Sequence, residues 1–318
     1  DKLAGYYGDA KTAVDRWTGI VDFCNDYNNY YALMSDGTVK TYINDYDDEL
    51  QGTSSWKNIT SIQIPDAYRH MLIGIDNDGH VSIAYERDTS SDEKYSVESW
   101  GNVVKVCYAY NTLIGLKNDN TLSVAYNSKA GEHLDASVLD LNDIVDIVYS
   151  EPYLAILHKD GSVSMELIGS FTSTKEYIER QKRLYLDVIK EIESWNGIVA
   201  LYHDAGGYFG IRYDGTMKYI SDDITYESKD SGYSYDRHSS LMSEVESWTD
   251  IIWVDGSSDS QFNINWVYAV GLKTDGTVIA TGNGTYYTTE KDAYGDGYHG
   301  VSHSDGSYNN VSAWKLWE

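Results

Sequence analysis

Residues 270–278 read Val-Gly-Leu-Lys-Thr-Asp-Gly-Thr-Val, in which apolar alternation runs into an Asp-Gly turn and out of it. The same frame recurs along the chain, with Asn once in place of Gly, and its turns stand at Asp36-Gly37, Asp78-Gly79, Asp119-Asn120, Asp160-Gly161, Asp214-Gly215 and Asp275-Gly276. Apolar alternation into Asp-Gly is the strongest short-range hairpin signal, because both turn residues must adopt positive φ. Each frame therefore predicts two antiparallel strands and a tight turn.

A second column of residues precedes each hairpin. It consists of Trp or Leu, at Trp17, Trp56, Trp100, Leu141, Trp195 and Trp248. Apolar residues follow three and six positions later, as Ile59 and Ile62 do after Trp56, which predicts a strand buried on both faces. A further short strand is predicted just before the Trp, as at residues 97–99. Three or four strands in about forty residues, repeated six times, predict an all-β fold, the β-propeller.

The repeat resembles that of the regulator of chromosome condensation family. The shared pattern is Trp-x-x-Ile-(Val)-x-Ile followed by Lys-x-Asp-Gly-Thr-Val, together with residues 281–284 (Thr-Gly-Asn-Gly) and with the small residues Gly74, Gly115, Gly210 and Gly271. The resemblance runs from about Val14 to Trp314 apart from insertions, but the family's glycine after the first strand is missing in most units. It implies a divergent, bacterial-type propeller. The family includes a bacterial secreted inhibitor of β-lactamase, so the resemblance also implies binding through one loop face.

We expect residues 1–318 to form a single propeller domain. Six blades are favoured, and seven, with one irregular, are the alternative. The predicted repeat units are 17–55, 56–99, 100–140, 141–194, 195–247 and 248–313, with a closing strand at 311–318. Ser173 and Glu176 have the spacing of a helix capping box, so a short helical insertion is predicted near 173–192.

Charge restricts the possible partners. The 318 residues include 24 Lys and Arg against 50 Asp and Glu, which gives a formal net charge of −26. Such a chain repels phosphate backbones, so we expect no nucleic-acid binding, and the family's chromatin binding is not carried over. Anionic lipid surfaces are disfavoured for the same reason, and no apolar run reaches the ~18 residues that insertion into a membrane needs.

The two cysteines, Cys24 and Cys107, occupy the same repeat position in units one and three. A whole blade separates them, so two buried free thiols are predicted rather than a disulfide. Cysteine usage therefore does not indicate the compartment.

Strand order places the first-to-second and third-to-fourth loops on one face of the disc, and this face carries most of the length variation and many tyrosines. Tyrosine offers a large contact area with a polar tip, so we expect binding residues there. The candidates are Tyr27, Tyr30, Tyr68, Tyr108, Tyr110, Tyr149, Tyr202, His203, Asp204, Asp255, Trp253 and Trp266. The competing interpretation is that some of these tyrosines belong to the core, because tyrosine is a good strand former.

No motif predicts a catalytic residue, a metal ligand or a cofactor. The acidic loops, such as 292–297, do not match a calcium-binding loop, and no histidine pair has zinc-ligand spacing. There is no phosphate-binding glycine loop or nucleophile elbow. A carboxylate pair from different blades would be invisible in the spacing, so enzymatic activity stays open, although binding is favoured.

The sequence thus favours a non-enzymatic module that binds a protein through a tyrosine-rich, acidic loop face. A carbohydrate-binding or carbohydrate-cleaving propeller is the first alternative, and a structural module of a larger surface protein is the second. We expect a monomer that is secreted or displayed on a bacterial cell surface. The grounds are abundant Tyr, Asp, Asn, Ser and Gly with little Lys, and a chain that starts at Asp1 as a mature or trimmed protein would.

Overall fold

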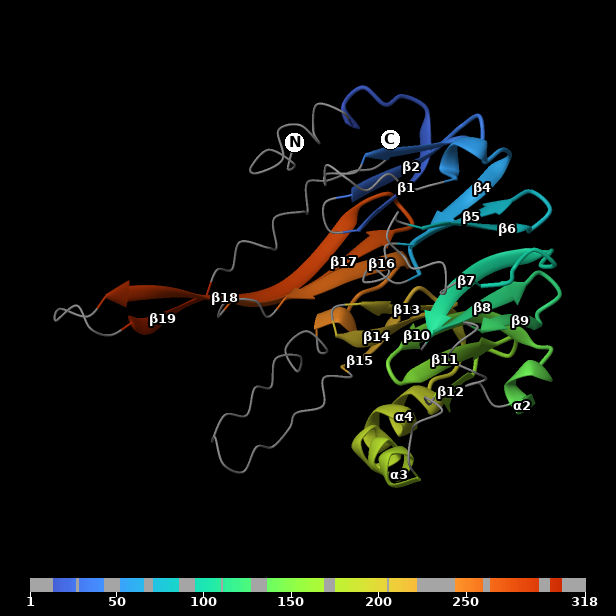
Figure 1. Ribbon diagram of the computed structural model, residues 1–318. Coiled ribbons are helices and arrows are strands. Elements are labelled where there is room, and N and C mark those ends of the chain that lie inside the picture. The colour runs from blue at the N-terminus through green and yellow to red at the C-terminus, as the bar shows by residue number, and fades with distance from the viewer. Residues whose placement is uncertain are drawn as a thin grey trace. The chain divides into compact units, whose positions relative to one another are not determined.

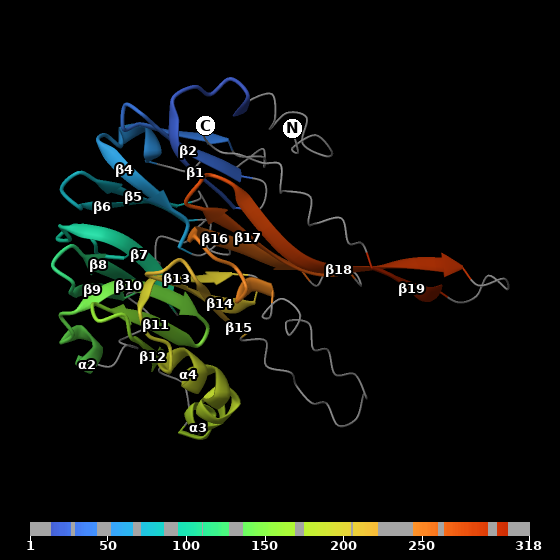
Figure 2. The same cartoon turned by 180° about the vertical axis from the view of Figure 1, so that it is seen from behind.

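A computed structural model of the chain describes residues 14–26, 29–42, 52–65, 71–85, 95–109, 111–126, 136–168, 175–204, 206–221, 244–259, 264–291 and 298–304. Within these ranges the strands form six separate antiparallel sheets that follow one another along the chain (Figure 1; Figure 2 from behind). This confirms the prediction of an all-β propeller with six blades. The predicted closing strand at 311–318 lies outside the described residues.

The first three sheets have three strands each, in sequence order. They comprise β1 (Ile20–Asp26), β2 (Asn29–Met34) and β3 (Val39–Tyr42); β4 (Ile59–Gln63), β5 (Met71–Asp76) and β6 (Val81–Tyr85); and β7 (Val103–Ala109), β8 (Thr112–Lys117) and β9 (Leu122–Tyr126).

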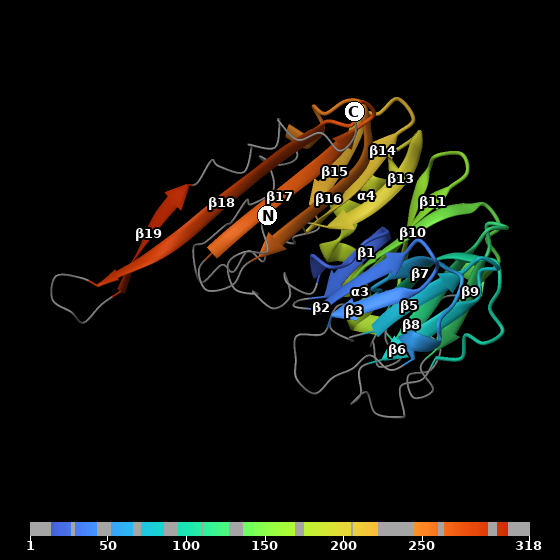
Figure 3. The same cartoon turned by 90° about the horizontal axis from the view of Figure 1, so that it is seen from above.

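The next two sheets also have three strands, and the last has four. They comprise β10 (Ile144–Ser150), β11 (Tyr153–His158) and β12 (Val163–Leu167); β13 (Ile198–Asp204), β14 (Gly207–Arg212) and β15 (Met217–Ser221); and β16 (Ile251–Asp259), β17 (Ile264–Lys273), β18 (Val278–Lys291) and β19 (Tyr298–Ser304). Figure 3 shows β16, β17 and β18 side by side, with β19 extending the outer edge of the sixth sheet.

Tertiary contacts divide the chain into two compact units. Unit 1 comprises residues 1–144 and 167–173, and unit 2 comprises residues 145–166 and 174–318. Unit 1 thus holds the first three blades, and unit 2 holds most of the fourth and the last two. The single domain and its repeat boundaries stay predictions.

Each hairpin turn is also the link to the next blade. The carbonyl of the second turn residue accepts a hydrogen bond from the first residue of the next first strand, in the pairs Gly37 and Ile59, Gly79 and Val103, Asn120 and Ile144, Gly161 and Ile198, and Gly215 and Ile251. Gly79 has φ 72°, and a Cβ there would lie 2.3 Å from the Val103 nitrogen. The residue must therefore be one that tolerates positive φ and close backbone approach.

The repeated tryptophan packs on the repeated glycine of the second strand. A Cβ at Gly74 or Gly115 would lie 2.7 Å from the ring of Trp56 or Trp100, and Gly210 and Gly271 face Trp195 and Trp248 in the same way. The fourth unit lacks both members of this pair and has Leu141 and Ile156 at the two positions. The indole ring thus occupies the space that a side chain would need at the repeated strand glycine.

The predicted short strand before each tryptophan is wrong in the described residues. Residues 97–99 and 245–247 form turns, and the segment before Trp195 belongs to a helix. In each case the backbone N–H of the tryptophan donates a hydrogen bond to the carbonyl three residues earlier, as Trp100 does to Val97 at 2.9 Å. This tight turn positions the indole ring against the glycine of the second strand. Its hydrogen bond takes the place of one that strand pairing would need.

The helical insertion is confirmed, but it contains two helices, α3 (Lys175–Leu184) and α4 (Leu186–Glu193), which join at Tyr185. Two other short helices occur among the described residues, η1 (Thr53–Ser55) and α2 (Ala136–Leu139). Helix α4 contacts β15, and Lys218 on β15 bonds to Glu246 at 3.1 Å and lies 3.7 Å from Glu191 of α4. Helix α4 therefore packs against the outer strand of the fifth blade.

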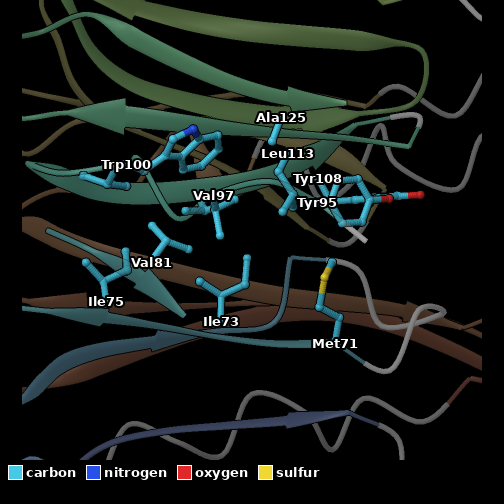
Figure 4. Close-up of a cluster of buried hydrophobic side chains, with 12 residues drawn as sticks. Met71, Ile73, Ile75, Val81, Tyr95, Val97, Trp100, Tyr108, Leu113 and Ala125 are labelled. Atoms are coloured by element: carbon cyan, nitrogen blue, oxygen red, sulfur yellow. The ribbon is translucent and has the colours of Figure 1, made fainter. Parts of the chain in front are cut away.

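Core clusters lie between neighbouring blades of the same unit. Between the second and third blades, Ile73 and Met71 on β5 pack against Tyr95, Val97 and side chains of β7 and β8, and these residues point toward one another in Figure 4. Ile73 is completely buried. Burial on both faces explains why the second strands are almost continuously apolar.

Candidate functional site

Six of the predicted binding residues come from three first strands of unit 2. Tyr149 lies on β10, Tyr202, His203 and Asp204 lie on β13, and Trp253 and Asp255 lie on β16. Strands β13 and β16 contact each other directly. We call the residues of β10, β13 and β16 within unit 2 the first-strand surface. The structure thus brings together residues that are about fifty positions apart in the sequence, because each repeat places its first strand beside the next.

A β-bulge shapes this surface. The register of β13 shifts between Ile198 and Ala200, and that of β16 shifts between Ile251 and Trp253. The extra residue of a bulge is left out of the ladder, and here Val199 is 57% exposed and Ile252 is 46% exposed. The next residue after Ile252, Trp253, has 42% of its surface exposed. Exposed large apolar side chains beside polar ones are typical of a contact surface.

Carboxylates lie among these apolar groups. Asp146 on β10 accepts a hydrogen bond from the backbone of Ile147 at 2.8 Å, and the exposed Asp255 accepts one from Gly256 at 2.9 Å. Burial, followed by the negative charge of Asp146, raises the pKa of Tyr202, so its hydroxyl stays protonated and can donate a hydrogen bond. The first-strand surface therefore combines negative charge, aromatic rings and a protonated phenol.

The predicted His203-Asp204 pair lies at the end of β13. The His203 ring meets Tyr208 on β14 edge to face, with the centroids 4.8 Å apart. Asp204 is paired in the ladder with Gly207, and its side chain lies outside the described atoms. Half-buried His203 is thus packed against its own blade, which fits a supporting position.

Two of the predicted tyrosines are buried. Tyr30 is 7% exposed and stacks on Phe23, with ring centroids 6.0 Å apart. Tyr108 is 8% exposed and donates a hydrogen bond to Asn111 at 2.9 Å. Both contribute to packing, as the competing interpretation expects, and they present little area to a partner. Their role in binding stays a prediction.

Three predicted tyrosines, Tyr27, Tyr68 and Tyr110, lie outside the described residues. Trp266 is described only by its backbone, which pairs with Asp259, the last residue of β16. It therefore belongs to the same end of the sixth blade as the carboxyl end of β16.

One group of side chains could hold a metal ion within the described ranges. Ligand atoms of Asp76, Asp78 and His80 lie within 4.8 Å of one another at the second hairpin turn. Asp76 already accepts hydrogen bonds from both the backbone and the ring of His80 and from the Asp78 backbone. These contacts explain the geometry without an ion. Sequence reasoning missed the cluster, although the spacing Asp-x-Asp-x-His, with His where the other turns have Thr or Ser, would have shown it.

Neither Cys24 nor Cys107 forms a disulfide, as predicted, but both are half-buried rather than buried. Burial, with the nearby Asp22 carboxylate, raises the pKa of Cys24 to about 12, so its thiol is protonated at neutral pH. Nucleophilic chemistry at Cys24 is therefore disfavoured. None of the described helices is both long and apolar enough to cross a membrane.

No protein-family model matches the chain, and no curated protein sequence is significantly similar to it. Among solved structures, the computationally designed Ika8 protein is 14% identical with a TM-score of 0.42, over 82% of this chain and 70% of that one. Prp20p from Saccharomyces cerevisiae, whose binding to Gsp1p and histones is described, is 11% identical with a TM-score of 0.40, over 78% and 65% of the two chains.

The fission yeast SREBP-SCAP binding domains are 10% identical with a TM-score of 0.40, over 96% of this chain and 92% of that one. At such identities, what these proteins bind does not transfer to this chain.

Proposed function

We propose that this propeller is a non-enzymatic module that binds a protein partner through its acidic, aromatic loop face together with the first-strand surface. The observation that carries the proposal is the grouping of exposed Trp253 and Asp255 with Tyr202 and Asp146 on neighbouring strands. Aromatic side chains dominate the binding energy of many protein interfaces.

The chemistry favours a partner with a basic surface. A net charge of −26 attracts cationic proteins and speeds their association. An arginine or lysine placed between an indole and a carboxylate gains both a cation–π contact and an ion pair. Trp253 and Asp255 offer this combination, two residues apart on β16.

We propose further that the protein acts outside a bacterial cell, either secreted or displayed on the surface, and as a monomer. Its composition, rich in tyrosine and acidic residues and poor in lysine, supports this location. Labelling of intact cells with a membrane-impermeant amine reagent tests the location, and protection of the protein until the cells are lysed would contradict it.

The test of binding uses the immobilised protein to capture partners, followed by affinity measurement with each purified partner. Trp253→Ala and Asp255→Asn are expected to weaken binding about tenfold each, as hot-spot truncations do. Tyr213→Ala is the matched control, because Tyr213 is 79% exposed in the hairpin turn of the fifth blade and is not on a first strand. A partner bound equally by all three variants would contradict the proposal.

A carbohydrate ligand is the second candidate, and the exposed indole of Trp253 favours it, since aromatic faces stack on sugar rings while carboxylates bond hydroxyl groups. A glycan array with the same variants distinguishes the two. Binding to an oligosaccharide that Trp253→Ala abolishes would replace the protein by a carbohydrate, and release of reducing ends would show a carbohydrate-cleaving enzyme. If neither a protein nor a glycan binds, a structural module of a larger surface protein is the better account.

A further inference from the structure

The two helices of the insertion carry a basic surface on a chain whose net charge is −26. Residues 180–186 read Arg-Gln-Lys-Arg-Leu-Tyr-Leu and span the end of α3 and the start of α4. This stretch contains three cations and no carboxylate. Positive charge is therefore concentrated at one place in a strongly acidic protein, and none of these residues belongs to the first-strand surface.

The helical hydrogen bonds run through the junction of α3 and α4. The Tyr185 N–H donates to the carbonyl four residues earlier at 3.0 Å, and the Tyr185 carbonyl accepts from the N–H four residues later at 2.8 Å. Side chains three and four positions apart therefore lie on one face of the helical path. The exposed Lys182 and Arg183 stand four and three positions before the exposed Leu186. We call these three residues the basic helix face.

The other side of the helical path is anchored to the blades of unit 2 (Figure 1). Tyr185 donates a hydrogen bond to the Glu151 carbonyl at 3.2 Å, and its ring centroid lies 5.1 Å from that of Tyr153. In α4, Ile192 is completely buried, and the helix contacts β15. The basic helix face is thus held in place before any partner arrives, which lowers the entropy that binding costs.

The two cations of the basic helix face are unused within the part of the chain that the structure describes. Neither the Lys182 nor the Arg183 side chain forms an ion pair or a hydrogen bond there, whereas Lys190, further along α4, lies 3.9 Å from Asp187. Cations in the last turn of a helix interact with its dipole. Here, however, the helical hydrogen bonds continue into α4, and the dipole does not explain why the neighbouring Leu186 is 45% exposed.

The chemistry of this face fits a short acidic segment. Adjacent Lys182 and Arg183 match two carboxylates, and a guanidinium group can bind one of them through two hydrogen bonds. Leu186 offers an apolar contact beside them. Nucleic acids and anionic membranes present extended arrays of negative charge, which a chain of net charge −26 repels. A short peptide reaches the two cations without bringing further negative charge close to the rest of the protein.

We propose that the basic helix face binds an acidic segment of a partner protein, in which two carboxylates contact Lys182 and Arg183 and an apolar side chain packs on Leu186. The segment is opposite in charge to the partner proposed for the first-strand surface, so it belongs to a second contact. The two surfaces share no residue, and each can be tested without the other.

The probe is a fluorescein-labelled nonapeptide, Asp-Glu-Asp-Glu-Leu-Asp-Glu-Asp-Glu, and its binding is followed by fluorescence polarisation at low ionic strength. Saturable binding is expected. Lys182→Gln and Arg183→Gln should each weaken it about fivefold, as for exposed ion pairs. Lys159→Gln is the matched control, because Lys159 is exposed in the hairpin turn of the fourth blade and its loss changes the net charge by the same amount.

The leucine contact separates a specific site from general charge attraction. Leu186→Ser should weaken binding about threefold, because the apolar contact is lost. Replacing the central leucine of the peptide by glycine should weaken binding to the wild type by a similar factor, but it should hardly change binding to Leu186→Ser. No saturable binding, an equal effect of Lys159→Gln, or independent effects of the two leucine changes would each overturn the proposal.

Two other occupants give different results. Sedimentation velocity detects a second copy of the chain, and flotation with phosphatidylserine vesicles detects an anionic membrane. Self-association or vesicle binding that Arg183→Gln abolishes would assign the basic helix face to that occupant and overturn the proposal. We expect neither, because both bring a large negative charge against a protein that is itself acidic.

Discussion

The pair Trp195 and Gly210 is open to a direct exchange, because the fourth unit has Leu141 and Ile156 at the same two repeat positions. Trp195 is 2% exposed, and a Cβ on Gly210 would lie 3.0 Å from its ring. We predict that Trp195→Leu and Gly210→Ile each destabilise the protein, and that the double variant is much more stable than the sum of the two changes implies.

The magnitudes follow from the packing. Trp195→Leu leaves a cavity where the indole lay, at a cost of about 2 kcal/mol. Gly210→Ile drives its side chain into the Trp195 ring and the Ile198 methyl group, both 3.0 Å from the added Cβ, and overpacking of this kind costs about 3 kcal/mol. In the double variant the isoleucine fills the cavity, so its total cost is expected to be about 2 kcal/mol, a coupling of about 3 kcal/mol.

Urea denaturation followed by far-ultraviolet circular dichroism measures all four proteins without depending on tryptophan fluorescence. Gly101→Ile is the control, because the nearest atoms to a Cβ there are 4.0 Å away, and its effect is expected within about 0.5 kcal/mol. If the two single changes add within about 0.5 kcal/mol, the indole and the glycine are not a packing unit and the reasoning fails.

Three other predictions concern single sites. Hydrogen bonds from the Thr277 hydroxyl and then from the Thr277 backbone N–H lower the pKa of Asp275. The Asp275 carboxylate therefore stabilises the fold above pH about 4, and this stabilisation disappears as the pH falls through the lowered pKa. Thr277→Val should raise the pKa of Asp275, and an unchanged carbon-13 titration of that carboxylate would contradict this. The Cys24 thiol, whose pKa is about 12, should react slowly with Ellman's reagent in the folded state and quickly in urea. Asn120→Ala should lower the free energy of unfolding by about 1–2 kcal/mol, because φ at this position is 70° and the hydrogen bond from the Asn120 side-chain amide to the Ile144 carbonyl is lost. Asn120→Gly should lower it by less, because glycine adopts positive φ without strain.

The hairpins were predictable because their determinants are local. The expectation of positive φ at both turn residues is wrong, because only the second residue of each turn, such as Gly276, has it. The turn at Asp275 also needs a hydroxyl on Thr277, which donates to the Asp275 carboxylate at 2.6 Å. The same contact recurs at Asp36, Asp119, Asp160 and Asp214. A motif whose hydrogen bonds span two residues is fully written in those residues.

The strand before the tryptophan could not be predicted from such a pattern. Val97-Glu98-Ser99 has apolar and polar residues in alternation, but the Trp100 N–H bonds to the Val97 carbonyl and the ring reaches Gly115 on another strand. A contact fifteen residues away decides the local conformation, because burying an indole outweighs a weak strand preference.

The candidate site likewise has features that local sequence predicts and features that depend on contacts with distant residues. Residue type and spacing are enough to predict the repeat, the Asp-to-Thr or Asp-to-Ser hydrogen bonds of the turns, the six blades and the acidic charge. Tertiary packing places Tyr30 and Tyr108 in the core, leaves Trp253 exposed beside a β-bulge, and sets helix α4 against β15. Exposure is a property of neighbours, and the neighbours of each strand in a propeller come from other repeats.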